Sequence, residues 1–221
     1  AIENAQKQVE SRNFQTRKNV LQYDDVMNTQ REVIYKERRK VLDGEDLQES
    51  IQNMLHNTVE NAIRGHMGEQ KHMTAEDFRE ATAQFRNMFL KPGELELTDE
   101  ELQQYDEDGL VDLVVGKAKE VYAAREQEFG SPLMRELERV LMLRVVDEYW
   151  MDQIDAMNDL KQGIGLRGYA QTDPVVAYKK EGYEMFEQMI AAIQEETLRR
   201  LFLVRLRQNQ EVRRERVAKV T

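Results

Sequence analysis

The sequence of 221 residues predicts an all-α protein made of one long helix, a group of shorter helices and an antiparallel pair of long helices. Apolar residues recur at steps of three or four over long segments, which is the period of an amphipathic helix. No segment shows the strict alternation of a half-buried strand. Only three prolines occur, and Ser131-Pro132 and Asp173-Pro174 place two of them where a helix can begin.

Residues 1–43 are predicted to form the long first helix. No proline or glycine interrupts this segment, and the glycine of Asp43-Gly44 is a suitable C-terminal stop. At about 1.5 Å per residue, the helix would be about 60 Å long. Its apolar residues are sparse: Ile2, Val9, Phe14, Leu21, Val26, Ile34 and Val41. A helix with so little to bury needs other modules as neighbours.

This helix also carries an unusual number of polar side chains. They are Arg12, Asn13, Arg17, Asp24, Asp25, Asn28, Arg31 and Tyr35. The simplest explanation is a solvated face, and the functional one is a helix that bridges domains. The adjacent carboxylates Asp24 and Asp25 do not predict a metal or acid–base site, because neighbouring side chains project about 100° apart on a helix.

Residues 44–130 change character and predict shorter helices. These span about 46–64, 74–90, 99–105 and 108–128. Thr98 with Glu101 forms a capping box, and Thr74 with Asp77 is a looser variant of it. The sequence Lys91-Pro92-Gly93 predicts a turn.

Two long helices are predicted to follow, one opened by Ser131 as a capping residue before Pro132 and the other by Asp173-Pro174. One apolar face is predicted for each. In the first it consists of Leu133, Leu137, Val140, Leu143, Val146, Trp150, Ile154, Met157 and Leu160. In the second it consists of Tyr178, Gly182, Phe186, Met189, Ile193, Thr197, Leu201 and Val204.

The connection between these helices, residues 161–173, is rich in glycine and carries apolar residues. Gly163, Gly165 and Gly168 are expected to stop helix propagation. Ile164, Leu166 and Tyr169 then lie on a turn with little core to bury them, which indicates contact with a partner. The alternative is a plain helix–helix turn closed by the tyrosine.

Composition excludes several classes of protein. The formal net charge of −10 argues against a general nucleic-acid binder. The absence of cysteine fits a reducing cytosol. No run reaches the roughly 18 apolar residues that span a bilayer. Since the chain begins at Ala1 without a signal-like segment, we expect it to be an excised piece of a longer protein.

Catalytic and metal-binding motifs are not found. The glycines at the turn are followed by no lysine and no strand, so they do not form a phosphate-binding loop. His56, His66 and His72 are too irregularly spaced for a helical metal site. We therefore expect no cofactor and no metal in this chain.

Three long motifs resemble the C-terminal part of the SecA family, the ATPase motors of bacterial preprotein translocation. They are E-S-R-N-F-Q-T-R-K-N-V-L-Q-Y-D-D-V-M-N-T-Q-R near the start, W-M-D-Q-I-D-A-M-N-D-L, and the connecting turn L-K-Q-G-I-G-L-R-G-Y-A-Q-T-D-P. The resemblance covers about residues 1–206 in order and is weakest in the middle third.

The resemblance implies an architecture. Residues 1–43 and 131–206 are similar to a helical scaffold domain whose last two helices form a two-helix finger with its tip at 161–173. Residues 44–130 are similar to a helical wing domain, and residues 207–221 to the start of a flexible linker. ATP and Mg²⁺ would belong to motor domains elsewhere in the parent protein, so this part alone is not expected to be an enzyme.

The resemblance also implies partners and site residues. In this family the finger tip contacts the unfolded preprotein at the cytoplasmic mouth of the SecY channel, at the inner face of the bacterial membrane. That role would fall here to Tyr169, with the flanking residues Arg167, Gln171, Ile164 and Leu166. The first helix would contact the nucleotide-binding and preprotein-binding domains through Arg12, Asn13, Arg17, Asp24 and Asp25.

Two alternatives come from different classes. One is an autonomous coiled-coil adaptor that pairs through the apolar face of 133–160, and the other is a basic amphipathic segment, Leu198 to Lys219, at a membrane surface. Apolar faces left without neighbours would also favour self-association.

Overall fold

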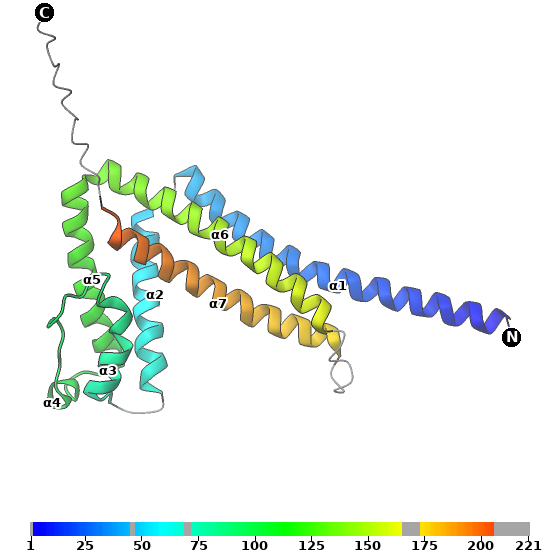
Figure 1. The fold of residues 1–221 in the computed structure, drawn as a ribbon, viewed down its shortest axis with the longest axis horizontal. Helices are drawn as coiled ribbons and strands as arrows, with labels where there is room; N and C mark the ends of the chain where they lie inside the picture. The colour runs from blue at the N-terminus through cyan, green and yellow to red at the C-terminus, as the bar shows by residue number, and fades with distance from the viewer. Residues whose placement is uncertain (1, 45–46, 69–71, 165–172, 206–221) are drawn as a thin grey trace, which may run out of the picture.

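The computed structural model describes residues 2–44, 47–68, 72–164 and 173–205, and within these ranges its regular elements are all helices. The elements in chain order are α1 (Ile2–Asp43), α2 (Leu47–Met67), α3 (Ala75–Ala81), η1 (Ala83–Phe85), α4 (Asp99–Leu102), α5 (Glu107–Phe129), α6 (Ser131–Ile164) and α7 (Pro174–Leu203). Figure 1 shows α1, α6 and α7 running side by side, with α2 and α5 crossing them at one end. The predicted fold class is confirmed.

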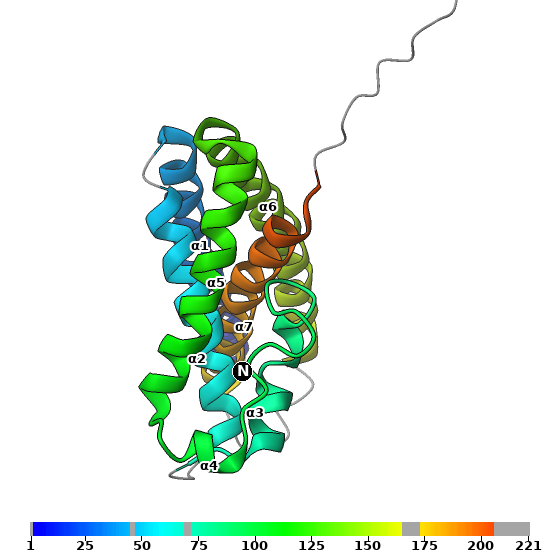
Figure 2. The same ribbon diagram turned by 90° about the vertical axis from the view of Figure 1, so that its left-hand side faces the viewer.

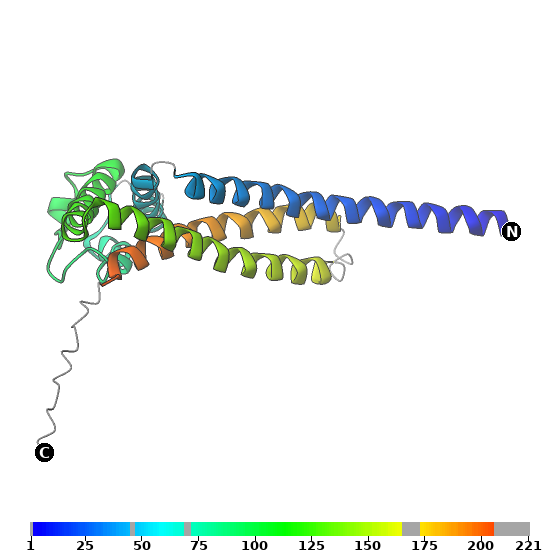
Figure 3. The same ribbon diagram turned by 90° about the horizontal axis from the view of Figure 1, so that it is seen from above.

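The long first helix is confirmed, and its stop is the predicted one. Gly44 has φ of 81°, the left-handed conformation that glycine adopts without a steric penalty. The first half of α1 extends beyond the other helices, as Figure 3 shows from above. Val9, Phe14 and Leu21 are exposed there, whereas Ile34 and Val41 in the second half are buried.

The helices of the middle region differ from the prediction in two places. The segment 74–90 is not one helix: α3 ends at Ala81, where the buried hydroxyl of Thr82 donates to the Phe78 carbonyl at 2.7 Å. A 3₁₀ turn and loop follow and direct Phe85 and Phe89 into the core. The segment 99–105 forms only the short helix α4. Burial of these aromatic rings outweighs continuation of the helix.

Four of the nine acidic side chains between Glu94 and Asp112 accept hydrogen bonds from backbone N–H groups: Glu94, Asp99, Glu101 and Asp106. The capping box of Thr98 and Glu101 is present, and the Thr74 side chain accepts from the Asp77 N–H. Asp106 accepts from the Gly109 N–H at 2.9 Å. The predicted turn at Lys91-Pro92-Gly93 is closed by the Glu94 N–H donating to the Lys91 carbonyl at 3.0 Å. Backbone capping therefore explains much of this charge.

The largest core joins the helices of the middle region, α2, α3 and α5 (the wing-like helices), to the first turns of α6 and the last turns of α7. Its buried members include Ile51, Leu55 and Val59 of α2, Leu110 and Val114 of α5, Met134 and Met142 of α6, and Leu198, Leu201 and Phe202 of α7. Figure 2 shows α2 and α5 standing beside the ends of the long helices. The middle region and the α6–α7 pair thus share one continuous core.

The predicted apolar face of α6 is confirmed at Trp150 and Met157, which are buried, and Leu137, Leu143 and Leu160 pack against the core; several buried positions were not predicted. The buried positions are Met134, Glu138, Met142, Val145, Trp150, Gln153, Met157 and Ile164. Leu133 and Val140 are exposed, and Val146 and Ile154 lie only at the edge of the core. Two of the buried residues are polar, and apolar periodicity does not detect polar core positions. Ser131 also lies inside the helix, because the Gly130 carbonyl already accepts from the Met134 N–H.

A buried polar network fixes the turn from α5 to α6. The Tyr122 hydroxyl donates to Glu138 at 2.5 Å, and Arg135 donates to Tyr122, at 2.7 Å, and to Glu126, at 3.1 Å. Glu138 is fully buried. Burial, and then the hydrogen bond and charge of Glu138, raise the pKa of Tyr122 well above its ordinary value of 10.

Replacing Tyr122 with Phe is expected to destabilise the protein by about 1 to 3 kcal/mol at pH 8, because the buried Glu138 loses a donor. Because the pKa of Tyr122 is raised in the folded state, the hydrogen bond of its neutral hydroxyl stabilises the protein fully below pH 10. Above pH 10 the tyrosine of the unfolded chain ionises, and this stabilisation is progressively lost. The difference between Tyr122→Phe and the parent chain should therefore shrink above pH 10. Urea unfolding at pH 8 and pH 11 measures it, and a constant difference would contradict the assignment.

Candidate functional site

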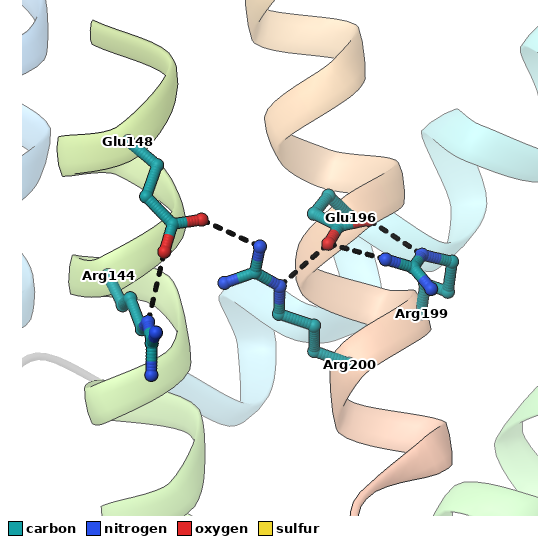
Figure 4. Close-up of polar contacts among 5 residues, drawn as sticks. All are labelled: Arg144, Glu148, Glu196, Arg199 and Arg200. Atoms are coloured by element: carbon teal, nitrogen blue, oxygen red, sulfur yellow. Dashed lines mark hydrogen bonds and ion pairs between the residues drawn. The ribbon is translucent and has the colours of Figure 1, made fainter. Parts of the chain in front are cut away.

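A ladder of charged side chains at the surface links α6 to α7, as drawn in Figure 4. Glu148 of α6 accepts from Arg144 at 3.0 Å and from Arg200 of α7 at 2.6 Å. Arg200 also bonds Glu196 at 2.7 Å, and Glu196 bonds Arg199 at 2.6 Å. Hydrogen bonds from these arginines lower the pKa of Glu148 and of Glu196.

Replacing Glu148 with Gln is expected to lower the melting temperature at pH 7, since Arg200 loses its partner on α6. A lowered carboxyl pKa contributes stability above the ordinary value of 4.5, and this is lost as the pH falls below it. The effect of the substitution should therefore fade at pH 3. Glu136→Gln is the matched control, because Glu136 pairs with Arg139 of the same helix. If Glu148→Gln and Glu136→Gln lowered the melting temperature equally, the ion pair between α6 and α7 would contribute no stability of its own.

The end of the hairpin next to the connecting turn is anchored to α1. Tyr23 of α1 packs edge-on against Tyr178 of α7, with ring centroids 4.7 Å apart. Lys161 of α6 pairs with Asp24 at 3.2 Å and lies over the Tyr23 ring. Asp173 accepts from the Val175 N–H at 2.8 Å and starts α7, as predicted. Both helices are thus fixed up to the residues that flank the connecting turn.

Two expectations for the turn need correction. Gly163 does not stop the helix, because α6 continues through Ile164. Ile164 is 1% exposed and packs with Met157 and Tyr178, so its side chain is part of the core and not of a surface offered to a partner. Periodicity could have shown this, since Ile164 lies seven residues beyond Met157 on one helical face.

The remaining predicted tip residues, Leu166, Arg167, Tyr169 and Gln171, lie outside the described residues. Their contact with a partner stays a prediction.

The predicted motor-contact residues fall into two groups. Arg12, Asn13 and Arg17 are exposed on the part of α1 that projects beyond the hairpin. Asp24 instead faces the hairpin through Lys161, and Asp25 is exposed with its carbonyl accepting from Thr29 at 2.9 Å. Exposed apolar residues alternate with the first group, Phe14 being 69% exposed. An apolar and polar helix surface of this kind suits contact with another folded module.

The structure adds buried polar residues that the sequence analysis missed. Gln30 donates to the Gly182 carbonyl at 2.9 Å, and Gln153 donates to Gln30 at 3.2 Å. Gln30 and Gln153 are each 5% exposed. Both occupy positions in line with apolar residues of their helices, and that placement is the only sequence signal that could have identified them.

Among the described residues, no group of three or more His, Cys, Asp or Glu side chains is arranged to hold a metal ion. No described helix is long and apolar enough to cross a membrane.

Comparison with known proteins identifies the family. The sequence model of the SecA Wing and Scaffold domain matches residues 1–205. The chain is 50% identical over 221 residues to protein translocase subunit SecA of Finegoldia magna, covering 100% of this chain and 24% of that protein. It is 49% identical over 216 residues to the subunit of Pelotomaculum thermopropionicum (98% and 24%) and 48% over 204 residues to that of Heliobacterium modesticaldum (92% and 24%).

The chain thus spans about a quarter of the length of these relatives. Together, the family match over residues 1–205 and the all-helical architecture show that the chain belongs to the SecA wing and scaffold domain family.

Proposed function

We propose that this chain is the scaffold, wing and finger part of a protein translocase subunit, and that it carries motion from ATP-hydrolysing domains to a polypeptide entering a membrane channel. The relatives are named as protein translocase subunits, and this chain corresponds to about a quarter of each. ATP and Mg²⁺ would bind to the rest of such a subunit, and the partners would be the SecY channel and the unfolded preprotein. The subunit would work at the cytoplasmic face of the membrane.

The observation that carries this proposal is the close packing of the α6–α7 hairpin against the long helix α1. α1 offers a projecting, exposed half for other domains, and its second half is packed along the hairpin. The anchors at Tyr23 and Lys161 hold the hairpin close to its connecting turn. A force applied to α1 would therefore be passed on to the hairpin with little deformation of the packed helices.

A photo-reactive amino acid at position 169 of the full-length subunit tests where the tip works. During ATP-driven translocation of a stalled preprotein, we expect adducts with the preprotein and with the channel. Tyr183 is the matched control, because it is a tyrosine of the same hairpin, 61% exposed, on the shaft of α7. Adducts at 183 but not at 169 would contradict the proposal.

An autonomous helical adaptor remains the competing function, favoured by the exposed apolar residues of α1. It predicts that the chain alone captures helical partners and that position 169 yields no adduct to a preprotein.

A further inference from the structure

A three-part polar junction lies at the point where α1, α6 and α7 meet. The Gln30 side-chain amide of α1 donates to the main-chain carbonyl of Gly182 in α7 at 2.9 Å. Its oxygen accepts from the side-chain amide of Gln153 in α6 at 3.2 Å. One residue of α1 therefore contacts both helices of the hairpin.

This junction is the polar part of a buried interface whose other buried members are apolar. The ion pairs Arg38–Asp147 and Asp24–Lys161 also join α1 to α6, but their side chains are exposed at the edge of the interface. On one side lies a cluster of Ile34, Val145, Trp150, Met189 and Ile193. On the other side lies a second cluster of Met157, Ile164 and Tyr178, with Tyr23 and Val26 of α1 against it. Gln30 and Gln153 are both 5% exposed, so water does not readily replace their hydrogen bonds.

Close approach of α7 is part of the geometry. A Cβ at Gly182 would lie 2.7 Å from the Met157 Cε and 3.7 Å from the Val26 Cγ1. Glycine at this position therefore lets the α7 backbone come near enough for its carbonyl to accept from Gln30.

Apolar contacts alone would define the alignment of these helices poorly. Hydrophobic attraction is non-directional, and an apolar helix face shifted by one turn still meets apolar neighbours. A buried amide is satisfied in one alignment only, and displacement leaves it without a partner in a dry interface. A single buried polar residue fixes register in coiled coils for the same reason.

We propose that Gln30, Gln153 and the Gly182 carbonyl form a register lock, and that this lock is where displacement of α1 passes to both helices of the hairpin. The coupling half of the proposal rests on the proposed function, whereas the register half concerns the fold alone. Gln30 and Gln153 are positioning residues in this scheme and contact no substrate.

Distance measurements between spin labels test the register. The chain has no native cysteine, so Glu32→Cys on α1 and Asp155→Cys on α6, both exposed, would be the only labelled sites. The parent chain should give one narrow distance. The double substitution Gln30→Met and Gln153→Met keeps side-chain volume but removes the amides, and should add a population shifted by about one helical turn, about 5.4 Å.

The matched control replaces two exposed glutamines of the same helices, Gln15→Met and Gln162→Met, and should keep the single distance. Circular dichroism on all variants shows whether each is folded. If the double variant does not fold, Gln30→Asn replaces it, since a shortened amide cannot reach both partners. A folded variant without the amides that keeps the single parent distance overturns the proposal.

Translocation by the full-length subunit tests the coupling. Gln30→Met with Gln153→Met should keep ATP hydrolysis and lose most of the protein translocated per ATP, whereas Gln188→Met, at an exposed position on the shaft of α7, should lose none. A shifted register with unchanged translocation per ATP overturns the coupling role. A parent subunit that translocates nothing would instead refute the proposed function and leave the register result standing.

Discussion

Replacing Tyr169 with Ala is expected to abolish protein translocation by the full-length subunit while leaving its fold and its ATP hydrolysis intact. A side chain on a loop tip contributes little to stability, because it lies outside the packed core. An aromatic ring offers a large, rigid contact area and one hydroxyl, which suits contact with polypeptides of varied sequence. Removal of the ring would therefore cost the contact and not the structure.

Three further variants sharpen this test. Tyr169→Phe should retain more translocation than Tyr169→Ala, since only the hydroxyl is lost. Arg167→Ala should be intermediate if its charge helps to place the tip at the channel. Tyr183→Ala removes an exposed tyrosine from the shaft of the same hairpin and should have little effect. Import of a preprotein into membrane vesicles, measured beside ATP turnover, gives the result. A normal rate for Tyr169→Ala would make the hairpin a structural element only.

Replacing Val145 with Asp is expected to unfold the α6–α7 hairpin. Val145 is fully buried, in a cluster with Ile34 and Trp150. An unpaired carboxylate placed there costs several kcal/mol, which is comparable with the total stability of about 5 to 15 kcal/mol for a domain. The melting transition followed by circular dichroism should fall by tens of degrees or disappear.

Val140 supplies the control for this substitution. It is the same residue type in the same helix but is 50% exposed, so Val140→Asp should leave the melting temperature nearly unchanged. Periodicity alone favours the neighbouring positions Val146 and Ile154, which lie at the edge of the core. An unchanged melting temperature for Val145→Asp would show that this face is not buried. An equally large loss for Val140→Asp would show that the effect does not depend on burial.

Val140 and Val145 look alike in the sequence but differ in burial. Val140 and Val145 are both valines in a long apolar pattern, and the sequence alone predicted the wrong one to be buried. The reason is physical: α6 faces α1, α7 and the wing-like helices at once, so its buried surface is wide, and it includes Glu138 and Gln153. A pattern that counts apolar residues omits these two and shifts the predicted face.

Local chemistry was sufficient for much of the fold. Helix period and the absence of internal breakers in residues 1–43 predicted the long helices, and the stop at Gly44 and the caps at Thr98 and Asp173 predicted several of the helix ends. These signals act within about one turn of the chain, so they can be read without knowledge of the tertiary structure. The long motifs near the start and around the connecting turn were likewise sufficient for the family, which the match over residues 1–205 confirms.

Tertiary structure alone decided which surfaces are hidden. Val145 is buried and Val140 is exposed although both belong to one apolar pattern, and the segment after Ala81 leaves the helix to bury Phe85 and Phe89. The junction of Gln30, Gln153 and Gly182 joins residues up to 152 positions apart. Burial and long-range hydrogen bonds depend on which helices meet, and no single segment of the sequence carries that information.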